Sequence, residues 1–373
     1  MTLCLEGFGT ALPAHRLTQD EAVALHTTFC RIDSRDARRL RALYRRSGIH
    51  TRHSVLLEGS DGPLEERQTF YPPAADDDDG GPSTVRRMAM YEAHAPPLAT
   101  TAARRALETG AVDPQEVTHL VTVSCTGFIS PGVDAKIIEE LGLRRDTQRT
   151  NVGFMGCHGA LNGLRVAASF AGRGEPVVPL VCSVELCTLH FSYGWDPDML
   201  VANALFSDGA AAVVGRAEPN GGGPDRGSSN GSRPWSVAGT GTHLMRDSED
   251  AMTWRIGDHG FRMTLSAQVP GLIESELRPW IVDWLAGFDL TLPDVGSWAV
   301  HPGGPRVLAS VERALDLDSE STSASREILA ECGNMSSATV LFILDRMRAR
   351  EAPRPCVALA FGPGLVVEAT LLT

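Results

Sequence analysis

Apolar and polar positions follow each other along the chain in stretches that predict an α/β protein. Short apolar runs predict strands at Met1–Gly9, Leu120–Ser124, Val177–Val184, Ala210–Val214, Trp298–Val300, Cys356–Phe361 and Leu365–Leu371. Helical spacing and proline positions predict helices that open at Pro96-Pro97, near Pro131 and after Cys157, and helices over Ser266–Leu285, Pro305–Leu315 and Asn334–Arg348. The helix after Cys157 is predicted to be buried, because one face carries Ala160, Leu161, Leu164, Ala167, Ala168 and Ala171.

The predicted elements occur in the same order twice: helix, strand, helix, helix, strand, strand. This repetition indicates an internally duplicated α/β protein in which helices sandwich two sheets, an αβαβα layered arrangement. We place the two halves at residues 1–218 and 235–373, and interpret Pro219–Pro234, rich in Gly, Ser and Asn, as the linker. Glu58–Ser83 is predicted to be a surface loop, and its run of four aspartates a solvated segment instead of a metal site.

Composition excludes several function classes. The net charge is −12 and Lys136 is the only lysine, so no basic face for nucleic acid is expected. The eight cysteines show no CxxC or Cys/His ligand spacing, which argues against zinc and favours reduced thiols in a cytoplasmic protein. No apolar run approaches the roughly 20 residues that a membrane span requires.

Cys157 is the first candidate for chemistry. It lies between Gly156 and Gly159 at the start of the predicted buried helix, where free backbone N–H groups and the helix dipole favour a thiolate. A lone cysteine is more often a packed core residue. The flanking glycines and two further candidates downstream favour a nucleophile here.

His301 and Asn334 are those two candidates. His301 follows a predicted strand and precedes Pro302-Gly303-Gly304-Pro305, which fixes an unusual backbone path and is expected where a side chain must be aimed. Asn334 could be a helix N-cap, although Ser336 or Ser337 could fill that role and leave it to point into a site. If the halves superimpose, Cys125 and His301 end matching strands, while Cys157 and Asn334 start matching helices. Both helix starts then meet at one central site.

A cysteine, a histidine and an asparagine together suit decarboxylative Claisen condensation. The thiolate holds an acyl group as a thioester, and two neutral donors bind the thioester oxygen of a malonyl unit as it loses carbon dioxide. A Cys-His hydrolase is an alternative, but it must admit and activate water, and the papain-type signature around the cysteine is absent.

Four ordered motifs make the chain resemble the thiolase-fold condensing enzymes, and within them the chalcone-synthase-like type III polyketide synthases. The motifs are Gly153-Phe154-Met155-Gly156-Cys157, Trp298-Ala299-Val300-His301-Pro302-Gly303-Gly304-Pro305, Gly333-Asn334-Met335-Ser336-Ser337-Ala338 and Phe361-Gly362-Pro363-Gly364. The resemblance implies a thiolase-like fold and a homodimer in which the segment near Ser130-Pro131 approaches the partner's cavity. Ketoacyl-ACP synthase III shares the three catalytic residue types, but the second and fourth motifs are similar to the type III synthases.

The resemblance also implies residue roles. Cys157 is the acyl-carrying nucleophile, while His301 and Asn334 drive malonyl decarboxylation. Phe206 matches the family's gatekeeping phenylalanine, and the Phe361, Gly362 and Pro363 segment is assigned to substrate binding. Arg45, Arg46 and Arg52 are candidates for binding CoA. The substrates are malonyl-CoA and a starter acyl-CoA, with no cofactor.

Three further positions bear on the product. Cys125 and Cys187 stand where bacterial members often carry cavity cysteines, although both could be core packing residues. Trp254 resembles a cavity-wall position, and its surrounding run is similar to alkylresorcinol and alkylpyrone synthases, which take long fatty acyl starters. The paired cysteines also resemble tetrahydroxynaphthalene synthase, which uses malonyl-CoA alone. A non-catalytic paralogue that binds acyl-CoA is the non-enzyme alternative.

Overall fold

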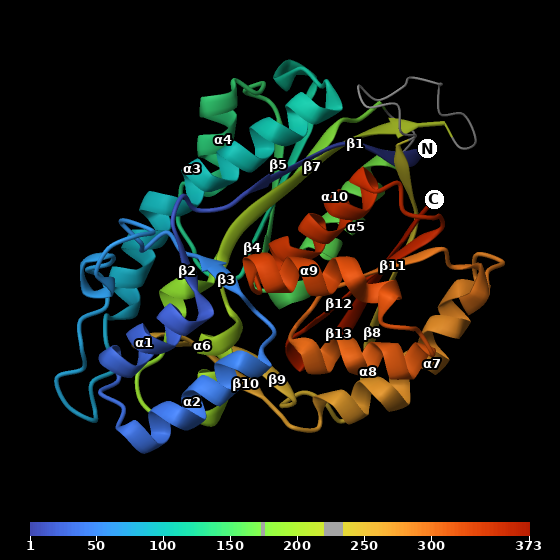
Figure 1. Cartoon of the computed structure of the whole chain (residues 1–373). Coiled ribbons are helices and arrows are strands. Elements are labelled where there is room, and N and C mark those ends of the chain that lie inside the picture. Colours follow the sequence, from blue (N-terminus) through green and yellow to red (C-terminus); the bar gives the residue numbers. More distant parts are fainter. Residues whose placement is uncertain (173–175, 220–233) are drawn as a thin grey trace.

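The computed structural model describes residues 1–172, 176–219 and 234–373 (Figure 1). The first half contains β1 (Thr2–Ala11), β2 (Arg16–Thr18), α1 (Gln19–Phe29), α2 (Ser34–Arg46), β3 (Thr51–His53), α3 (Thr84–Gly110), β4 (His119–Ser124), α4 (Val133–Leu141), β5 (Gln148–Gly153), α5 (Gly159–Ala171), β6 (Pro179–Leu186), α6 (Pro197–Leu205) and β7 (Asp208–Glu218). The second half contains β8 (Trp235–Leu244), β9 (Met252–Gly257), β10 (Gly260–Leu265), α7 (Val269–Ala286), β11 (Ser297–Val300), α8 (Pro305–Leu315), α9 (Ser323–Cys332), α10 (Thr339–Ala349), β12 (Cys356–Gly362) and β13 (Val366–Leu372).

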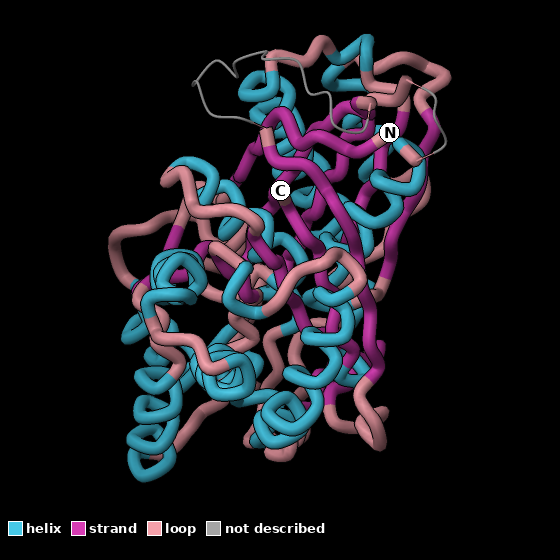
Figure 2. Tube along the Cα trace, turned by 90° about the vertical axis from the view of Figure 1, so that its right-hand side faces the viewer, coloured by secondary structure: helices cyan, strands magenta, loops and turns pink. Residues whose placement is uncertain are grey.

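Nine strands form one mixed sheet in the order β11-β12-β13-β8-β1-β7-β6-β4-β5. Strand β4 runs parallel to β5 and β6, and β11 runs parallel to β12. The two sheets expected from the duplicated pattern are joined through a short antiparallel pairing of β1 with β8, in which Leu3 to Leu5 lie opposite Trp235 to Val237. Figure 2 shows the strands side by side with helices packed around them.

The layers follow the predicted αβαβα order. Helices α5 and α10 fill the centre, where their apolar faces meet Val121 and Val123 of β4 and Ala358 and Ala360 of β12. The opposite faces of the strands point to the outer layers. Leu120 packs with α3 and α4, whereas Val357 and Leu359 of β12 pack with α7 and α8. This alternation is the two-residue period of a strand that is buried on both sides.

Helix α3 corrects one prediction. The helix does not open at Pro96-Pro97 but begins at Thr84, and both prolines lie inside it. Each proline removes a backbone N–H from the helix interior, which is unfavourable. The helix persists because its alanines lie against β1, where a Cβ at Gly7 or Gly9 would come within 2.1–2.2 Å of a carbonyl oxygen of α3. Such close packing over a long helix outweighs the local cost of the prolines.

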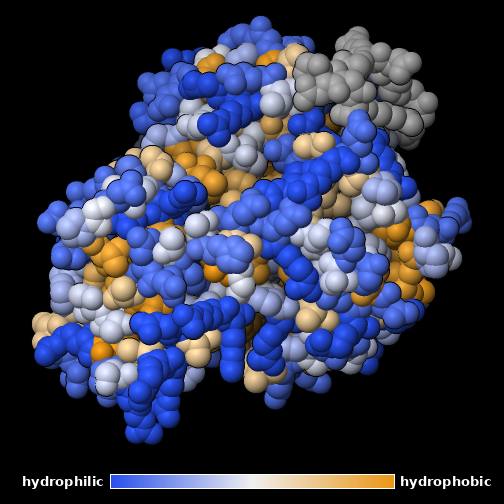
Figure 3. All heavy atoms as spheres, in the orientation of Figure 1, coloured by the Kyte–Doolittle hydropathy of each residue, from blue (hydrophilic) through white to orange (hydrophobic). Residues whose placement is uncertain are grey.

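Helices α1, α2 and α6 form a separate cluster beside the layered core. Ala22, Leu40, Tyr44 and Leu200 are buried where the three helices meet. Sequence patterns did not predict α1, α2, α6 or the β9–β10 hairpin. The face in Figure 3 is largely hydrophilic, with hydrophobic residues in scattered patches. The described helices include none with the length and apolar character of a membrane span. Most of the predicted linker lies outside the described residues.

Candidate active site

Cys157 lies in a short 3-10 turn, Gly156–His158, between β5 and α5. Gly156 adopts a positive φ of 76°, and a Cβ there would lie 2.2 Å from Cδ of Pro363, so this turn requires glycine. Cys157 is half-buried, whereas six of the other seven cysteines are fully buried. Burial raises the pKa of the Cys157 thiol to about 12, although hydrogen bonds from Ser336 and Asn334 oppose that rise. Burial therefore favours the neutral thiol, whereas the two hydrogen bonds favour the thiolate.

Asn334 lies directly beside the Cys157 thiol. Its backbone is held by Leu205 and Ser207: the Asn334 N–H donates to Leu205 O at 2.9 Å, and the Ser207 N–H donates to Asn334 O at 2.9 Å. Its Oδ1 accepts the backbone N–H of Ser336 at 2.8 Å, which leaves the amide nitrogen to donate toward Cys157. Asn334 is not a helix N-cap, because α10 begins at Thr339 with Ala338 as its N-cap. Its oxygen closes a local turn and its nitrogen faces the thiol.

His301 follows directly after β11 and is almost completely buried, with 1% of its surface exposed. Neither ring nitrogen has a hydrogen-bond partner among the described residues. Burial, followed by the charge of His158, lowers the pKa of His301 to about 3, so the ring is neutral. His158 is the residue after Cys157, which places the imidazole next to the nucleophile's turn. A buried polar group without a partner calls for an explanation, and a bound substrate oxygen provides one.

A buried carboxylate, Glu185, lies behind the thiol and escaped the sequence analysis. It accepts hydrogen bonds from the backbone N–H of Cys125 at 3.0 Å and from Thr126 Oγ1 at 2.7 Å, and also from Ser337 Oγ. Desolvation raises the pKa of Glu185, and these donors oppose that rise. The Cys125 thiol bridges Glu185 Oε1 at 3.3 Å and Ser336 Oγ at 3.2 Å. The available signal was a single acidic residue within the apolar run of β6.

A small pocket opens in front of Cys157. It is lined by Cys125, Thr126, Gly156, Cys157, Cys187, Phe206, Met252, Thr253, Trp254, Met263, Ser336 and Pro363. The Trp254 indole donates to Cys125 O at 2.8 Å and lies edge-on to Phe206, with ring centroids 6.1 Å apart. Five of the predicted substrate-binding residues therefore line the pocket: Cys125, Cys187, Phe206, Trp254 and Pro363.

The remaining predicted residues lie elsewhere. Gly362 packs against His158, where a Cβ would come within 2.4 Å of the imidazole, and Phe361 belongs to the outer core beside α7 and α8. Arg45 and Arg46 are exposed at the end of α2.

Arg52 is directed inward. Its guanidinium donates to the carbonyls of Asn203 at 2.6 Å and Phe206 at 3.0 Å, so it holds the backbone of Phe206. Its binding to CoA stays a prediction.

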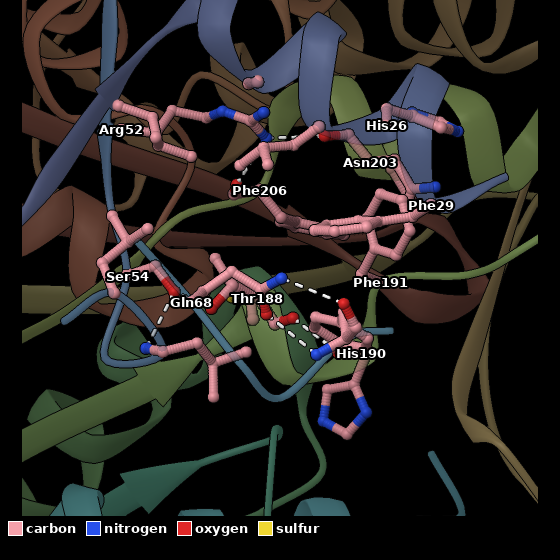
Figure 4. Close-up of a pocket in the computed structure, with 18 of the residues that line it drawn as sticks. His26, Phe29, Arg52, Ser54, Gln68, Thr188, His190, Phe191, Asn203 and Phe206 are labelled. Atoms are coloured by element: carbon pink, nitrogen blue, oxygen red, sulfur yellow. Dashed lines mark hydrogen bonds between the residues drawn. The ribbon is translucent and has the colours of Figure 1, made fainter. Parts of the chain in front are cut away.

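A larger cavity lies on the other side of Phe206. It is larger than the Cys157 pocket, and the lining that it exposes is mostly apolar, with Leu25, Phe29 and Phe191 among its walls. Cys187, Phe206 and Trp254 line both this cavity and the Cys157 pocket, and therefore form the wall between them. In Figure 4, Arg52, Asn203 and Phe206 lie along one side of the cavity, and Ser54, Thr188 and His190 lie along the other.

Models of two known domain families match almost all of the two halves of the chain. The model for the N-terminal domain of chalcone and stilbene synthases matches residues 2–219, and the model for their C-terminal domain matches residues 237–373.

Individual relatives point in the same direction. The chain is 36% identical over 367 residues to a 1,3,6,8-tetrahydroxynaphthalene synthase of Streptomyces peucetius subsp. caesius, covering 97% of this chain and 91% of the relative. It is 32% identical over 375 residues to the alpha-pyrone synthesis polyketide synthase-like Pks18 of Mycobacterium tuberculosis, covering 98% and 90%. The crystal structure of PKS-I from the brown alga Ectocarpus siliculosus superimposes with a TM-score of 0.88 at 29% identity, covering 100% of this chain and 98% of the other.

Proposed function

The chain belongs to the chalcone and stilbene synthase family and is a type III polyketide synthase, and on that premise we propose that Cys157, His301 and Asn334 are its catalytic residues. Enzymes of this family are acyltransferases that use CoA thioesters and need no cofactor. The observation that carries the assignment is the meeting of the Cys157 thiol with the Asn334 amide, beside a buried and neutral His301.

The proposed reaction begins with acyl transfer. The Cys157 sulfur attacks the thioester carbonyl of the starter, a new carbon–sulfur bond forms, and the CoA thiolate leaves and takes up the proton lost by the cysteine. Burial favours the protonated thiol, so the cysteine must lose its proton during the attack. The Asn334 amide, which already donates to the sulfur, is placed to stabilise negative charge there.

Decarboxylation follows at the same two donors. The malonyl carboxylate leaves as carbon dioxide, and its bonding electrons form an enolate whose oxygen is bound by His301 and Asn334. The enolate carbon then attacks the acyl group on Cys157, and the thiolate departs from the lengthened chain. The neutral imidazole carries one ring N–H, which His301 can donate to the enolate oxygen.

We propose that the starter is a long-chain fatty acyl-CoA and that the product is an alkylresorcinol or an alkylpyrone. Support comes from the Cys157 pocket, whose wall of Phe206 and Trp254 adjoins the larger cavity, and from the relative named for alpha-pyrone synthesis. A second candidate is synthesis of tetrahydroxynaphthalene from malonyl-CoA alone. The two buried cysteines in the pocket, Cys125 and Cys187, and the relative with that name favour it.

One incubation separates the two candidates. Purified protein is supplied with radiolabelled malonyl-CoA, with and without a series from dodecanoyl-CoA to octadecanoyl-CoA, and products are identified by mass spectrometry. Products that contain the added acyl chain support the fatty starter. A naphthalene product that is formed equally well without any acyl-CoA would assign the second function and leave the catalytic residues unchanged.

We further propose that the enzyme is a homodimer whose interface includes the segment near Ser130-Pro131. Two large hydrophobic side chains near this segment and the Cys157 turn, Phe128 and Met155, are 44% and 38% exposed in the single chain. Such residues favour burial against a partner. Sedimentation velocity at several protein concentrations measures the assembly, and a monomer throughout would refute the proposal.

A further inference from the structure

Three polar side chains form a row along the largely apolar helix α5, and the proposed reaction uses none of them. His158 is the N-cap of α5, and Asn162 and Arg165 follow it at helical spacing, so the three lie on one face of the helix. His158 comes directly after Cys157 and is 2% exposed. Polar side chains in a buried central layer are unfavourable unless they are hydrogen-bonded, so this row requires partners.

The carboxylate of Glu368 on β13 provides the partner. Its side chain is 3% exposed and accepts hydrogen bonds from Asn162 Nδ2 at 2.9 Å, from Arg165 at 2.6 Å and from Thr242 Oγ1 at 2.8 Å. Asn162 Oδ1 lies 2.7 Å from His158 Nδ1. A continuous chain of hydrogen bonds therefore runs from the ion pair of Arg165 with Glu368 to the turn that carries the nucleophile.

This chain of hydrogen bonds fixes the position of the proton on His158. A carboxylate only accepts hydrogen bonds, so the amide nitrogen of Asn162 faces Glu368 and the amide oxygen faces His158. The Nδ1 atom of His158 must therefore carry a hydrogen. Burial lowers the pKa of His158, although its hydrogen bond with Asn162 opposes that effect. A neutral ring with its hydrogen on Nδ1 leaves Nε2 as an acceptor.

The other edge of the His158 ring lies against the end of β12. A Cβ on Gly362 would come within 2.4 Å of His158 Cδ2 and 2.6 Å of Nε2. The ring is therefore held by Asn162 on one edge and by the main chain of Gly362 on the other. Because His158 is covalently next to Cys157, an anchored ring also anchors the turn that presents the thiol. The charge of His158 also affects the site, since it contributes to the low pKa of His301.

We propose that His158 is a positioning residue for acyl transfer, which holds the turn of Cys157 while Asn162 and Glu368 keep its ring neutral. The inference rests on the proposed role of Cys157 as the nucleophile. An imidazolium at position 158 would favour the thiolate of Cys157, so the charge of this ring governs how readily the thiol loses its proton. The other charged or titratable groups around this pair are Arg165, Glu368, His301 and Glu185.

Two substitutions of Asn162 test the two parts of this role. Asn162→Asp still accepts the Nδ1 hydrogen of His158 but places a second carboxylate beside Glu368, and the two repel each other unless His158 takes up a proton. Alkylation of Cys157 by iodoacetamide, a reaction of the thiolate, should then be about tenfold faster at pH 7. Asn162→Leu keeps the branched outline of the side chain but leaves His158 Nδ1 without a partner, so acyl loading should be about tenfold slower.

The experiment measures three rates in wild type and in both variants. Intact-protein mass spectrometry follows acyl loading, peptide mapping follows alkylation of Cys157 by iodoacetamide at a series of pH values, and release of radiolabelled carbon dioxide follows decarboxylation of malonyl-CoA. Asn151→Asp is the matched control, because it makes the same chemical change at an exposed position. Decarboxylation should change little in any variant, because it depends on His301 and Asn334.

The outcomes separate this role from the proposed function. Faster alkylation in Asn162→Asp or slower acyl loading in Asn162→Leu, with decarboxylation retained, supports the positioning role, and each variant is a test if the other fails to fold. Wild-type rates in the folded variants overturn the role of His158 and leave Cys157 as the nucleophile. Equal losses of acyl loading and decarboxylation indicate a general distortion of the site and also overturn it. Acyl groups attached to another residue in wild type would overturn the proposed function itself.

Discussion

Replacing Asn334 by aspartate separates its two hydrogen bonds. The substitution keeps the shape of the side chain and the oxygen that accepts the Ser336 N–H at 2.8 Å, but it removes the amide that donates toward Cys157. Loss of one oxyanion donor costs about 3 kcal/mol, or roughly 150-fold in rate. A carboxylate at this position also repels the negative charge that develops on the enolate oxygen, so decarboxylation should fall by at least that factor.

Two measurements test the effect of Asn334→Asp on catalysis. Release of carbon dioxide from radiolabelled malonyl-CoA reports decarboxylation, and intact-protein mass spectrometry reports acyl loading on Cys157. Asn151→Asp makes the same chemical change at an exposed position and serves as the control. The folded state should persist in Asn334→Asp because the turn keeps its acceptor, whereas Asn334→Ala loses it at a cost of about 1–3 kcal/mol in unfolding free energy. Carbon dioxide release within threefold of wild type would refute the assigned role of the amide.

Three other predictions concern Cys157 and the histidines. Cys157→Ala should abolish acyl loading but leave slow decarboxylation of malonyl-CoA, and acyl groups that still attach would identify another nucleophile. His301→Ala should lower carbon dioxide release by roughly 150-fold, and a rate close to wild type would remove His301 from the mechanism. Burial lowers the pKa of His26, His190 and His301 to about 3. Below pH ~6.5, each of these rings takes up a proton when the protein unfolds. The unfolding free energy should therefore decrease by up to about 1.4 kcal/mol per histidine for each unit by which the pH is lowered. Urea unfolding at a series of pH values from 8 to 5 measures this loss of unfolding free energy. In His190→Gln, the dependence of the unfolding free energy on pH should correspond to the uptake of one proton fewer. A wild-type unfolding free energy that does not change with pH would contradict the argument from burial.

Local patterns in the sequence predicted much of the architecture. Apolar runs located β4, β6, β7, β11, β12 and β13, and glycines and prolines located the turns that carry Cys157 and His301. These features depend on neighbouring residues, which a linear pattern records. The helix Pro305–Leu315 was predicted at the bounds it has in the structure.

The remaining features depend on contacts between distant segments. Pro96 and Pro97 fit inside α3 only because the helix packs on the glycines of β1, which no local pattern reveals. Arg52 looks like a free cation until Asn203 and Phe206 present their carbonyls to it. Glu185 was overlooked for the same reason, since its donors come from the residues just after β4 and from the turn after Asn334.

The pairing of Asn334 with the segment Leu205 to Ser207 has a consequence for recombining relatives. Both hydrogen bonds use main-chain atoms, so they place no demand on the side chains at these positions. A hybrid protein assembled from the first half of one synthase and the second half of another should therefore recreate the pairing without compensating substitutions. Its catalytic pocket would then combine Phe206 from the donor of the first half with Trp254 from the donor of the second.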